Sequence, residues 1–319
     1  MKSKFSPIII FTYNRKDHTK KTLESLVVNK EFNESSVYIF SDGFKGEKDK
    51  EKVIEVRNFL KKFKRKYKNV DITIVERVEN LGLEKSVILG VSSVINKFGK
   101  AIVLEDDLKV SPYFLQYMNL LLDFFENSKD VGSITGYNPV KNLNINNNTQ
   151  VFFSQRTCSY GWGTWERVWE EVDWNAEKYS EFKTNIKQRR KFNKTGLDRA
   201  IRLDNQMHNG AQSWSVKFGF DLFVRQKLTV YPVKSYLKNL GWDGSGTHNS
   251  KFDILLNNSI DAKENLDIKE QQINKQEWQF ARNFETGETT KILISDNKSN
   301  AKKLNDYEIM KVARITKKI

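Results

Sequence analysis

The stretch Ala101-Ile102-Val103-Leu104-Glu105-Asp106-Asp107 decides the fold class of this 319-residue chain. A run of apolar residues that includes β-branched side chains is typical of a parallel strand buried on both faces. Three carboxylates follow it directly, and adjacent charges at the end of a buried strand are unfavourable unless something compensates them. A hard divalent cation, bound together with substrate phosphate oxygens, would compensate them. The alternative is that Asp106 and Asp107 cap the helix that starts near Ser111-Pro112.

Short apolar runs like this one recur on its N-terminal side, and each is followed by a helical pattern. The expected strands are residues 8–12, 37–40, 72–75 and 101–104, and the expected helices are residues 17–28, 47–68 and 84–96. This alternation predicts an α/β fold, with a doubly wound, mostly parallel sheet flanked by helices.

Polar residues stand just past three of the expected strands. They are Asn14-Arg15, Asp42 and the acidic triplet Glu105-Asp106-Asp107. Because ligands of such sheets bind at the carboxyl ends of the strands, we expect these side chains to converge on one crevice.

Composition limits the class of protein. Cys158 is the single cysteine, so no disulfide forms within the chain and a reducing, cytoplasmic compartment fits best. No stretch approaches the roughly 18 apolar residues that a membrane-spanning helix needs. Hydrophobic residues make up 38% of the chain, which is enough for a sizeable core.

The formal net charge of +14 has three interpretations. A lysine-rich solvated exterior is one, and a peripheral contact with the anionic inner face of a membrane is the second. Nucleic-acid binding is the third and is not expected, because no helix-turn-helix, RNP or zinc-finger pattern occurs.

Several short motifs carry a family resemblance. The segment Pro7–Arg15 resembles the first strand and nucleotide-contact loop of GT-A glycosyltransferases. The segment Val103–Pro112 resembles N-acetylglucosaminyltransferase I and its relatives in glycosyltransferase family 13, and Ser41-Asp42-Gly43 matches that family's second nucleotide-contact turn. The segments Gly161–Trp165 and Asp243–His248 resemble related bacterial family 2-like sugar transferases.

This resemblance covers about residues 6–250 and implies a GT-A-like, Rossmann-like domain. It implies an inverting hexosyltransferase that moves a hexose or N-acetylhexosamine from a UDP-sugar, with Mn²⁺ or Mg²⁺ as cofactor. The acceptor would be a glycan or lipid-linked glycan of bacterial polysaccharide biosynthesis.

The resemblance also implies roles for single residues. Asp107 would ligate the metal, Asp106 would face the ribose, and Glu105 would orient the donor sugar. The other nucleotide and donor contacts would come from Thr12, Asn14, Arg15, Asp42, Trp162 and His248.

Inversion requires a general base near the acceptor hydroxyl. In the family an acidic residue lies near a Trp that corresponds to Trp214, but here its neighbours are Gln212 and Ser213. Asp204 is the substitute that the sequence offers. A helix N-cap or turn residue is the alternative interpretation of Asp204.

Trp162 and His248 also have two interpretations each. Trp162 lies between two glycines and would stack on a pyranose from a loop, or else it packs in the core with Trp165 and Trp169. His248 follows Gly-Ser-Gly and would reach the diphosphate or the metal, or else it is a surface histidine.

The expected organisation has three parts. Residues 1–107 would form the nucleotide-sugar-binding half of a GT-A domain, residues 108–250 its acceptor-binding half, and residues 251–319 an extension of unknown role. Two other functions stay open. A sugar-phosphate nucleotidyltransferase is disfavoured because Thr12–Arg15 contains no phosphate-binding glycine. A catalytically impaired, basic binding protein would bind with a strong salt dependence.

Overall fold

Four parallel strands form the N-terminal half of the main sheet. The computed structural model describes residues 4–139, 151–196, 198–241 and 260. The parallel strands are β1 (Ile8–Thr12), β2 (Val37–Ser41), β3 (Ile72–Glu76) and β4 (Lys100–Glu105). They lie in the order β3-β2-β1-β4, so the expected strands and the mostly parallel α/β class are confirmed.

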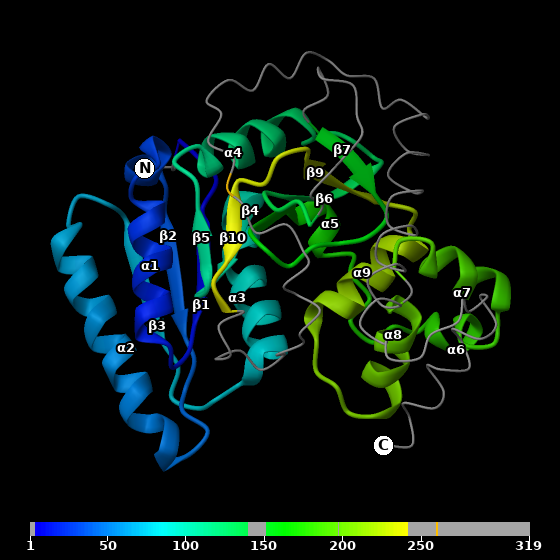
Figure 1. Ribbon diagram of the computed structural model, residues 1–319, viewed down its shortest axis with the longest axis horizontal. Coiled ribbons are helices and arrows are strands. Elements are labelled where there is room, and N and C mark those ends of the chain that lie inside the picture. The colour runs from blue at the N-terminus through cyan, green and yellow to red at the C-terminus, as the bar shows by residue number, and fades with distance from the viewer. Residues whose placement is uncertain (1–3, 140–150, 197, 242–259, 261–319) are drawn as a thin grey trace, which may run out of the picture.

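The connecting helices cover both faces of this half, and Figure 1 shows α1 and α2 side by side. These helices are α1 (Lys16–Leu26), α2 (Glu47–Lys66) and α3 (Gly82–Phe98). Right-handed crossovers put α1 and α2 on one face, and α3 on the other, because the strand order reverses after β3. Helix α3 approaches the sheet closely at Gly90, where a Cβ would lie 2.7 Å from the Phe11 ring.

The other half of the sheet is largely antiparallel. Strand β8 (Trp162–Trp165) runs antiparallel to β4, although the sequence suggested a loop here. Gly163 permits this pairing, because a Cβ there would lie 3.1 Å from the Ala101 carbonyl oxygen. The remaining strands follow β8 in the order β6 (Val131–Thr135), β9 (Leu228–Pro232) and β7 (Val151–Ser154).

The eight-stranded sheet contains strands from both sides of residue 107, the expected boundary between the two halves, because β1 to β4 precede that residue and β6 to β9 follow it. Directly after that point, β5 (Leu108–Val110) pairs with β10 (Leu237–Asn239) in a second, two-stranded sheet. Helix α4 (Phe114–Phe124) follows β5, and the short η1 (Lys30–Glu34) precedes β2.

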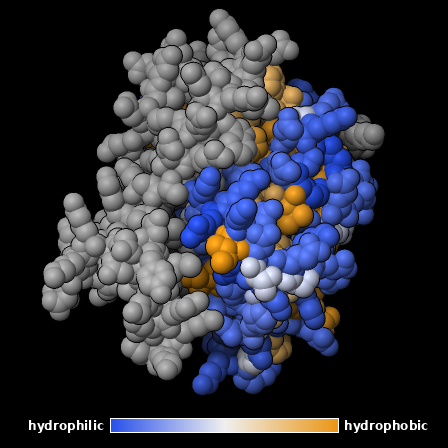
Figure 2. Space-filling view, turned by 90° about the vertical axis from the view of Figure 1, so that its right-hand side faces the viewer, coloured by the Kyte–Doolittle hydropathy of each residue, from blue (hydrophilic) through white to orange (hydrophobic). Residues whose placement is uncertain are grey.

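A helical unit lies beside the antiparallel half, at the right of Figure 1. It has its own aromatic core, in which Phe182 lies edge-on to Phe192 and Phe220. Its outer surface is mostly hydrophilic, with separate hydrophobic spots (Figure 2). Its helices are α6 (Tyr179–Phe182), α7 (Ile186–Asn193), α8 (Arg199–His208) and α9 (Trp214–Val224), whereas the short α5 (Glu166–Trp169) packs on β8 and α3.

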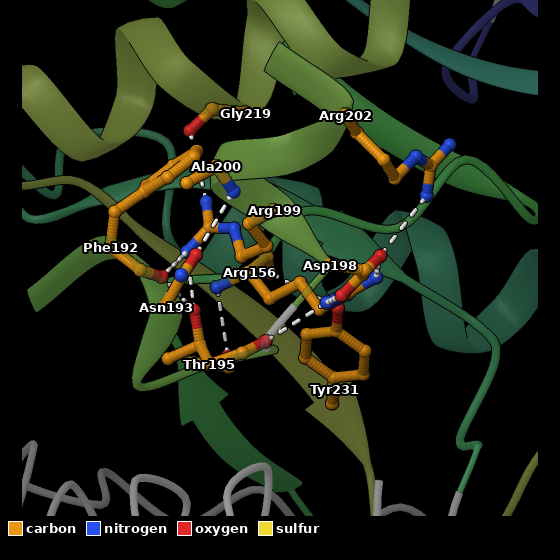
Figure 3. Close-up of polar contacts among 11 residues, drawn as sticks. Arg156, Phe192, Asn193, Thr195, Asp198, Arg199, Ala200, Arg202, Gly219 and Tyr231 are labelled. Atoms are coloured by element: carbon orange, nitrogen blue, oxygen red, sulfur yellow. Dashed lines mark hydrogen bonds and ion pairs between the residues drawn. The ribbon is translucent and has the colours of Figure 1, made fainter. Parts of the chain in front are cut away.

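An arginine cluster ties this unit to the loop after β7 (Figure 3). Both terminal nitrogens of Arg156 donate to Asp198, each at 2.8 Å. The buried Arg199 guanidinium lies 3.8 Å from the centre of the Phe192 ring and donates to the Gly219 carbonyl. The cluster has a structural role, because Arg156 is held by a carboxylate and the Thr195 carbonyl, and Arg199 by carbonyls, the Thr195 hydroxyl and the Phe192 ring.

In the portions of the chain that the structure describes, every helix is too short or too polar to cross a lipid bilayer.

Candidate active site

The carboxyl ends of β1, β2 and β4 meet at one edge of the sheet. Thr12 is paired with Ser41 across β1 and β2, and Phe11 with Glu105 across β1 and β4. The residues just beyond these positions therefore lie close together, as the sequence indicated.

Arg15 connects two of these strand ends. Its guanidinium donates to Asp106 Oδ1 and, at 2.9 Å, to Asp107 Oδ2. Burial alone would lower the pKa of Arg15, but the charges of both carboxylates outweigh it and raise that pKa. This arginine is therefore a fixed internal cation on the acidic turn.

The acidic turn has more negative charge than Arg15 compensates. Burial, and then the charges of Asp107 and Asp106, raise the pKa of Glu105 to about 8. Burial also raises the pKa of Asp106 to about 6, although Arg15 opposes it. Asp106 Oδ2 is buried and has no hydrogen-bond partner among the described residues. The site thus has an unmatched, buried carboxylate oxygen.

Backbone contacts hold the acidic turn from two sides. The Thr22 hydroxyl of α1 donates to the Asp106 carbonyl at 2.7 Å. The Leu240 amide, just past β10, donates to the Asp107 carbonyl at 2.7 Å. Segments more than a hundred residues apart therefore fix the direction of both aspartates.

The donor set suits a cation that also binds phosphate. No group of three or more His, Cys, Asp or Glu side chains within the described ranges is arranged to hold a metal alone. Mg²⁺ and its relatives, however, take one or two carboxylates and complete their shell with water and substrate phosphates. Asp106 Oδ2, which has no hydrogen-bond partner among the described residues, and the Asp107 carboxylate, whose side chain is 12% exposed, fit that kind of site.

Asp42 shapes the neighbouring loop. Its carboxylate accepts hydrogen bonds from the backbone amides of Gly43 and Leu81 at 3.0 Å and of Gly82 at 3.1 Å. Gly43 is required there, since a Cβ would lie 2.7 Å from the backbone nitrogen of Asn80. Asp42 therefore joins the loop after β2 to the start of α3.

The side chains of Thr12 and Asn14 point to protein partners. The buried Thr12 hydroxyl donates to the Phe40 carbonyl at 3.4 Å. The Asn14 amide donates to Asp49, in the first turn of α2, at 3.3 Å. Both residues lie at the edge that holds the acidic turn, and both stabilise the loop after β1.

Trp162 lies inside the protein. Its indole is 1% exposed and stacks on Trp214 with ring centres 4.6 Å apart. Trp169 and Phe218 also pack against its ring. The expectation that Trp162 stacks on a pyranose does not fit this packing, because its ring is enclosed by other aromatic side chains.

Asp204 lies within α8, in the helical unit. Its Oδ1 accepts hydrogen bonds from the Tyr179 hydroxyl and the Arg189 guanidinium, both at 2.9 Å, and its Oδ2 accepts from Arg189 at 2.7 Å. Burial, and then the hydrogen bond to Asp204, raise the pKa of Tyr179 to about 12. Both oxygens of Asp204 are thus engaged. His248 lies outside the described residues.

Two residues that the sequence did not single out also border this edge. Glu84, in the first turn of α3, accepts from Lys217 at 2.6 Å and from Gln206 at 3.0 Å, which ties α3 to α9 and α8. Gly241 lies against the carboxylate of Asp107. A carboxylate in the first turn of a helix after a strand was the available signal for Glu84. For Gly241 the signal was its place before Trp242-Asp243-Gly244.

Comparison with protein families gives one match, to the family described as "GNT-I family", over residues 1–194. The chain belongs to the GNT-I family. The resemblance to the N-acetylglucosaminyltransferase I family is thereby confirmed. Curated protein sequences give no match.

Solved structures resemble this GNT-I family member distantly. One is S. aureus TarS residues 1–349 in complex with UDP-GlcNAc, at 10% identity and a TM-score of 0.43, covering 73% of this chain and 57% of that one. Another is GalNAc-T7 with UDP, GalNAc and Mn²⁺, at 9% identity and a TM-score of 0.44, covering 72% and 42%. A third is a cytidylyltransferase from Leptospira borgpetersenii, at 10% identity and a TM-score of 0.32, covering 53% and 63%. The chain thus spans less than two thirds of the length of each.

Proposed function

We propose that this GNT-I family member transfers a hexose or N-acetylhexosamine from a UDP-sugar, with Mn²⁺ or Mg²⁺. One observation carries the proposal: Arg15, at the end of β1, lies on Asp106 and Asp107, at the end of β4. A buried, over-acidic turn of this kind at the carboxyl edge of an α/β sheet suits a nucleotide diphosphate and its cation.

In this proposal, different residues contact different parts of the UDP-sugar donor. Arg15 and the loop that Asp42 holds would contact the uridine, with Thr12 and Asn14 shaping the neighbouring loop. Asp106 would face the ribose and Asp107 would hold the cation. A bound cation would supply neutralisation of the charge that develops on the diphosphate leaving group.

Glu105 would orient the donor sugar. Because its pKa is raised to about 8, its carboxyl holds a proton at neutral pH in the donor-free protein. A protonated carboxyl donates one hydrogen bond and accepts others, so it can either donate to a sugar hydroxyl or accept from one.

Inversion at the anomeric carbon is the proposed stereochemistry, and it requires a base at the acceptor hydroxyl. Asp204 is the proposed base, and its ion pair with Arg189 competes with that role. His248 is proposed to reach the diphosphate. The acceptor is proposed to be a glycan or lipid-linked glycan of a bacterial polysaccharide pathway.

A peripheral contact with anionic membrane at the cytoplasmic face is part of the same proposal. It is supported by the C-terminal half of α2, where exposed lysines gather. These are Lys61, Lys62, Lys64 and Lys66.

Titration calorimetry with UDP and UDP-sugars tests the function. We expect Mn²⁺ or Mg²⁺ to strengthen the binding of UDP, and Asp107→Ala to abolish this metal-dependent gain in affinity. Lys16→Ala, which removes an exposed pair with Glu55, is the control and should bind as the wild type does. Unchanged binding by Asp107→Ala contradicts the metal role. A wild-type protein that binds no UDP or UDP-sugar under any of these conditions contradicts the function.

A further inference from the structure

A short segment from the second half of the chain, residues 237–241, packs against the acidic turn. Its strand β10 pairs with β5 so that Asn239 lies opposite Leu108. The Leu240 amide then donates to the carbonyl of Asp107 at 2.7 Å. The His18 ring of α1 lies 3.4 Å from the Leu240 carbonyl oxygen on the other side. The family match ends at residue 194, so this segment lies beyond it.

Gly241 brings the segment against the Asp107 side chain itself. A Cβ at Gly241 would lie well inside van der Waals contact of Asp107 Oδ2 and 3.1 Å from Asn239 Oδ1. The Gly241 amide donates to that same Asn239 oxygen at 2.6 Å, which fixes the Cα in place. Asp107 Oδ2 is also the atom that accepts from Arg15 at 2.9 Å. Backbone on one side and a guanidinium on the other therefore confine one carboxylate oxygen.

We propose that Gly241 is a positioning residue for the metal ligand Asp107. The missing side chain lets the chain pass in contact with the carboxylate and fixes the direction in which its other oxygen points. This inference rests on the proposed function, since it takes Asp107 as the cation ligand.

A methyl group at Gly241 can be accommodated at low energetic cost in one way, by rotation of the Asp107 side chain. The Asn239 and Leu240 hydrogen bonds hold the backbone, whereas the Asp107 carboxylate is the end of a side chain that rotates. Gly241→Ala should therefore turn this carboxylate, weaken its contact with Arg15 and misdirect the cation. Changes in the groups that orient a metal ligand lower metal affinity by about tenfold or more.

The experiment measures UDP affinity with and without Mn²⁺ by calorimetry, in the full chain, for the wild type and Gly241→Ala. The ratio of the two affinities isolates the cation from general damage to the fold. We expect this ratio to fall by about tenfold in Gly241→Ala while the affinity for metal-free UDP is unchanged. Gly46→Ala is the matched control, because a Cβ there meets no atom within 4 Å, and its ratio should equal the wild-type one.

A thermal double-mutant cycle tests the contact without metal or nucleotide. Gly241→Ala should lower the melting temperature of the wild type but not that of Asp107→Ala, where the carboxylate that it would strike is gone. The cycle also covers the case in which Gly241→Ala alone folds poorly. Equal losses in both backgrounds overturn the contact.

The remaining outcomes separate the inference from the proposed function. If the wild type binds UDP with Mn²⁺ and Gly241→Ala keeps the full ratio, the positioning role is wrong while the function stands. If Mn²⁺ does not change the wild-type affinity for UDP, the cation role of Asp107 and the positioning role both fail.

Discussion

The guanidinium of Arg15 lies 2.9 Å from Asp107 Oδ2 and also donates to Asp106, so one side chain neutralises part of a buried acidic turn. Arg15→Met would leave Asp106, which is 3% exposed, without its cation. Removing one partner of a buried ion pair costs about 3 kcal/mol or more, because the other charge stays desolvated. Urea unfolding at neutral pH measures this loss.

The matched control for Arg15→Met is Lys16→Met, one residue along the chain. Lys16 pairs with Glu55 at 3.4 Å, and both side chains are about half exposed. Exposed pairs contribute less than about 1 kcal/mol. Equal losses in the two variants would show that the Arg15 contacts do not stabilise the fold.

The aromatic group around Trp162 makes a second prediction. Trp162→Ala should lower the free energy of unfolding by about 3–5 kcal/mol, because it leaves a cavity among Trp214, Trp169 and Phe218. Val78→Ala is the surface control, since Val78 is 90% exposed. Denaturant unfolding measures both. A loss below 1 kcal/mol in Trp162→Ala would mean that the indole is not part of the core.

The parallel half of the fold was predictable from local sequence. Runs such as Ile8–Thr12 and Ala101–Leu104 are apolar on both faces, so they indicate buried strands without knowledge of their neighbours. Strand β8 was not predictable in the same way. Trp162-Gly163-Thr164-Trp165 has the glycine and aromatic content of a loop, and it becomes a strand only because β4 and β6 lie on either side of it.

The candidate site was predictable in position and less so in contacts. The ends of β1, β2 and β4 fix where Arg15, Asp42 and the acidic turn lie. That Arg15 reaches carboxylates 91 and 92 residues further along the chain depends on side-chain geometry alone. The contact between Gly241 and Asp107 was even less predictable from the sequence, because it forms only after β10 has paired with β5.

Variants of Asp204 and Arg189 can distinguish a structural role of Asp204 from a catalytic one. Asp204→Asn removes the ion pair with Arg189 and should cost about 2 kcal/mol of stability, as expected for a charge-assisted hydrogen bond. If the ion pair is its role, Arg189→Met should cost a similar amount and the double variant little more. If Asp204 is the base, Asp204→Asn should lose turnover while donor affinity stays unchanged.

The stability and the turnover of these variants are measured on the same protein preparations, and turnover is corrected for the folded fraction. Full turnover by Asp204→Asn rules out the base. An additive cycle, in which the double variant loses the sum of the single losses, rules out the pair as a stabilising contact.

Glu105 makes the stability of the donor-free protein depend on pH. Its pKa is about 8 in the folded chain against an ordinary value of 4.5, because burial and the charges of Asp107 and Asp106 disfavour its ionised form. Between these two values the folded state binds more protons than the unfolded state, so stability falls as the pH rises. Glu105→Gln removes this contribution. The stability of Glu105→Gln minus that of the wild type should therefore increase as the pH is raised from about 5 to about 8.5.

Urea unfolding at those two pH values, at constant ionic strength, gives the difference between variant and wild type at each. Trp162→Phe is the control, because it changes no titrating group and should differ from the wild type equally at both pH values. Asp106, whose pKa is about 6, also titrates in this range but is present in every protein compared, so it largely cancels in the differences. If Glu105→Gln differs from the wild type by the same amount at both pH values, the Glu105 carboxyl is not held in its protonated form by the acidic turn.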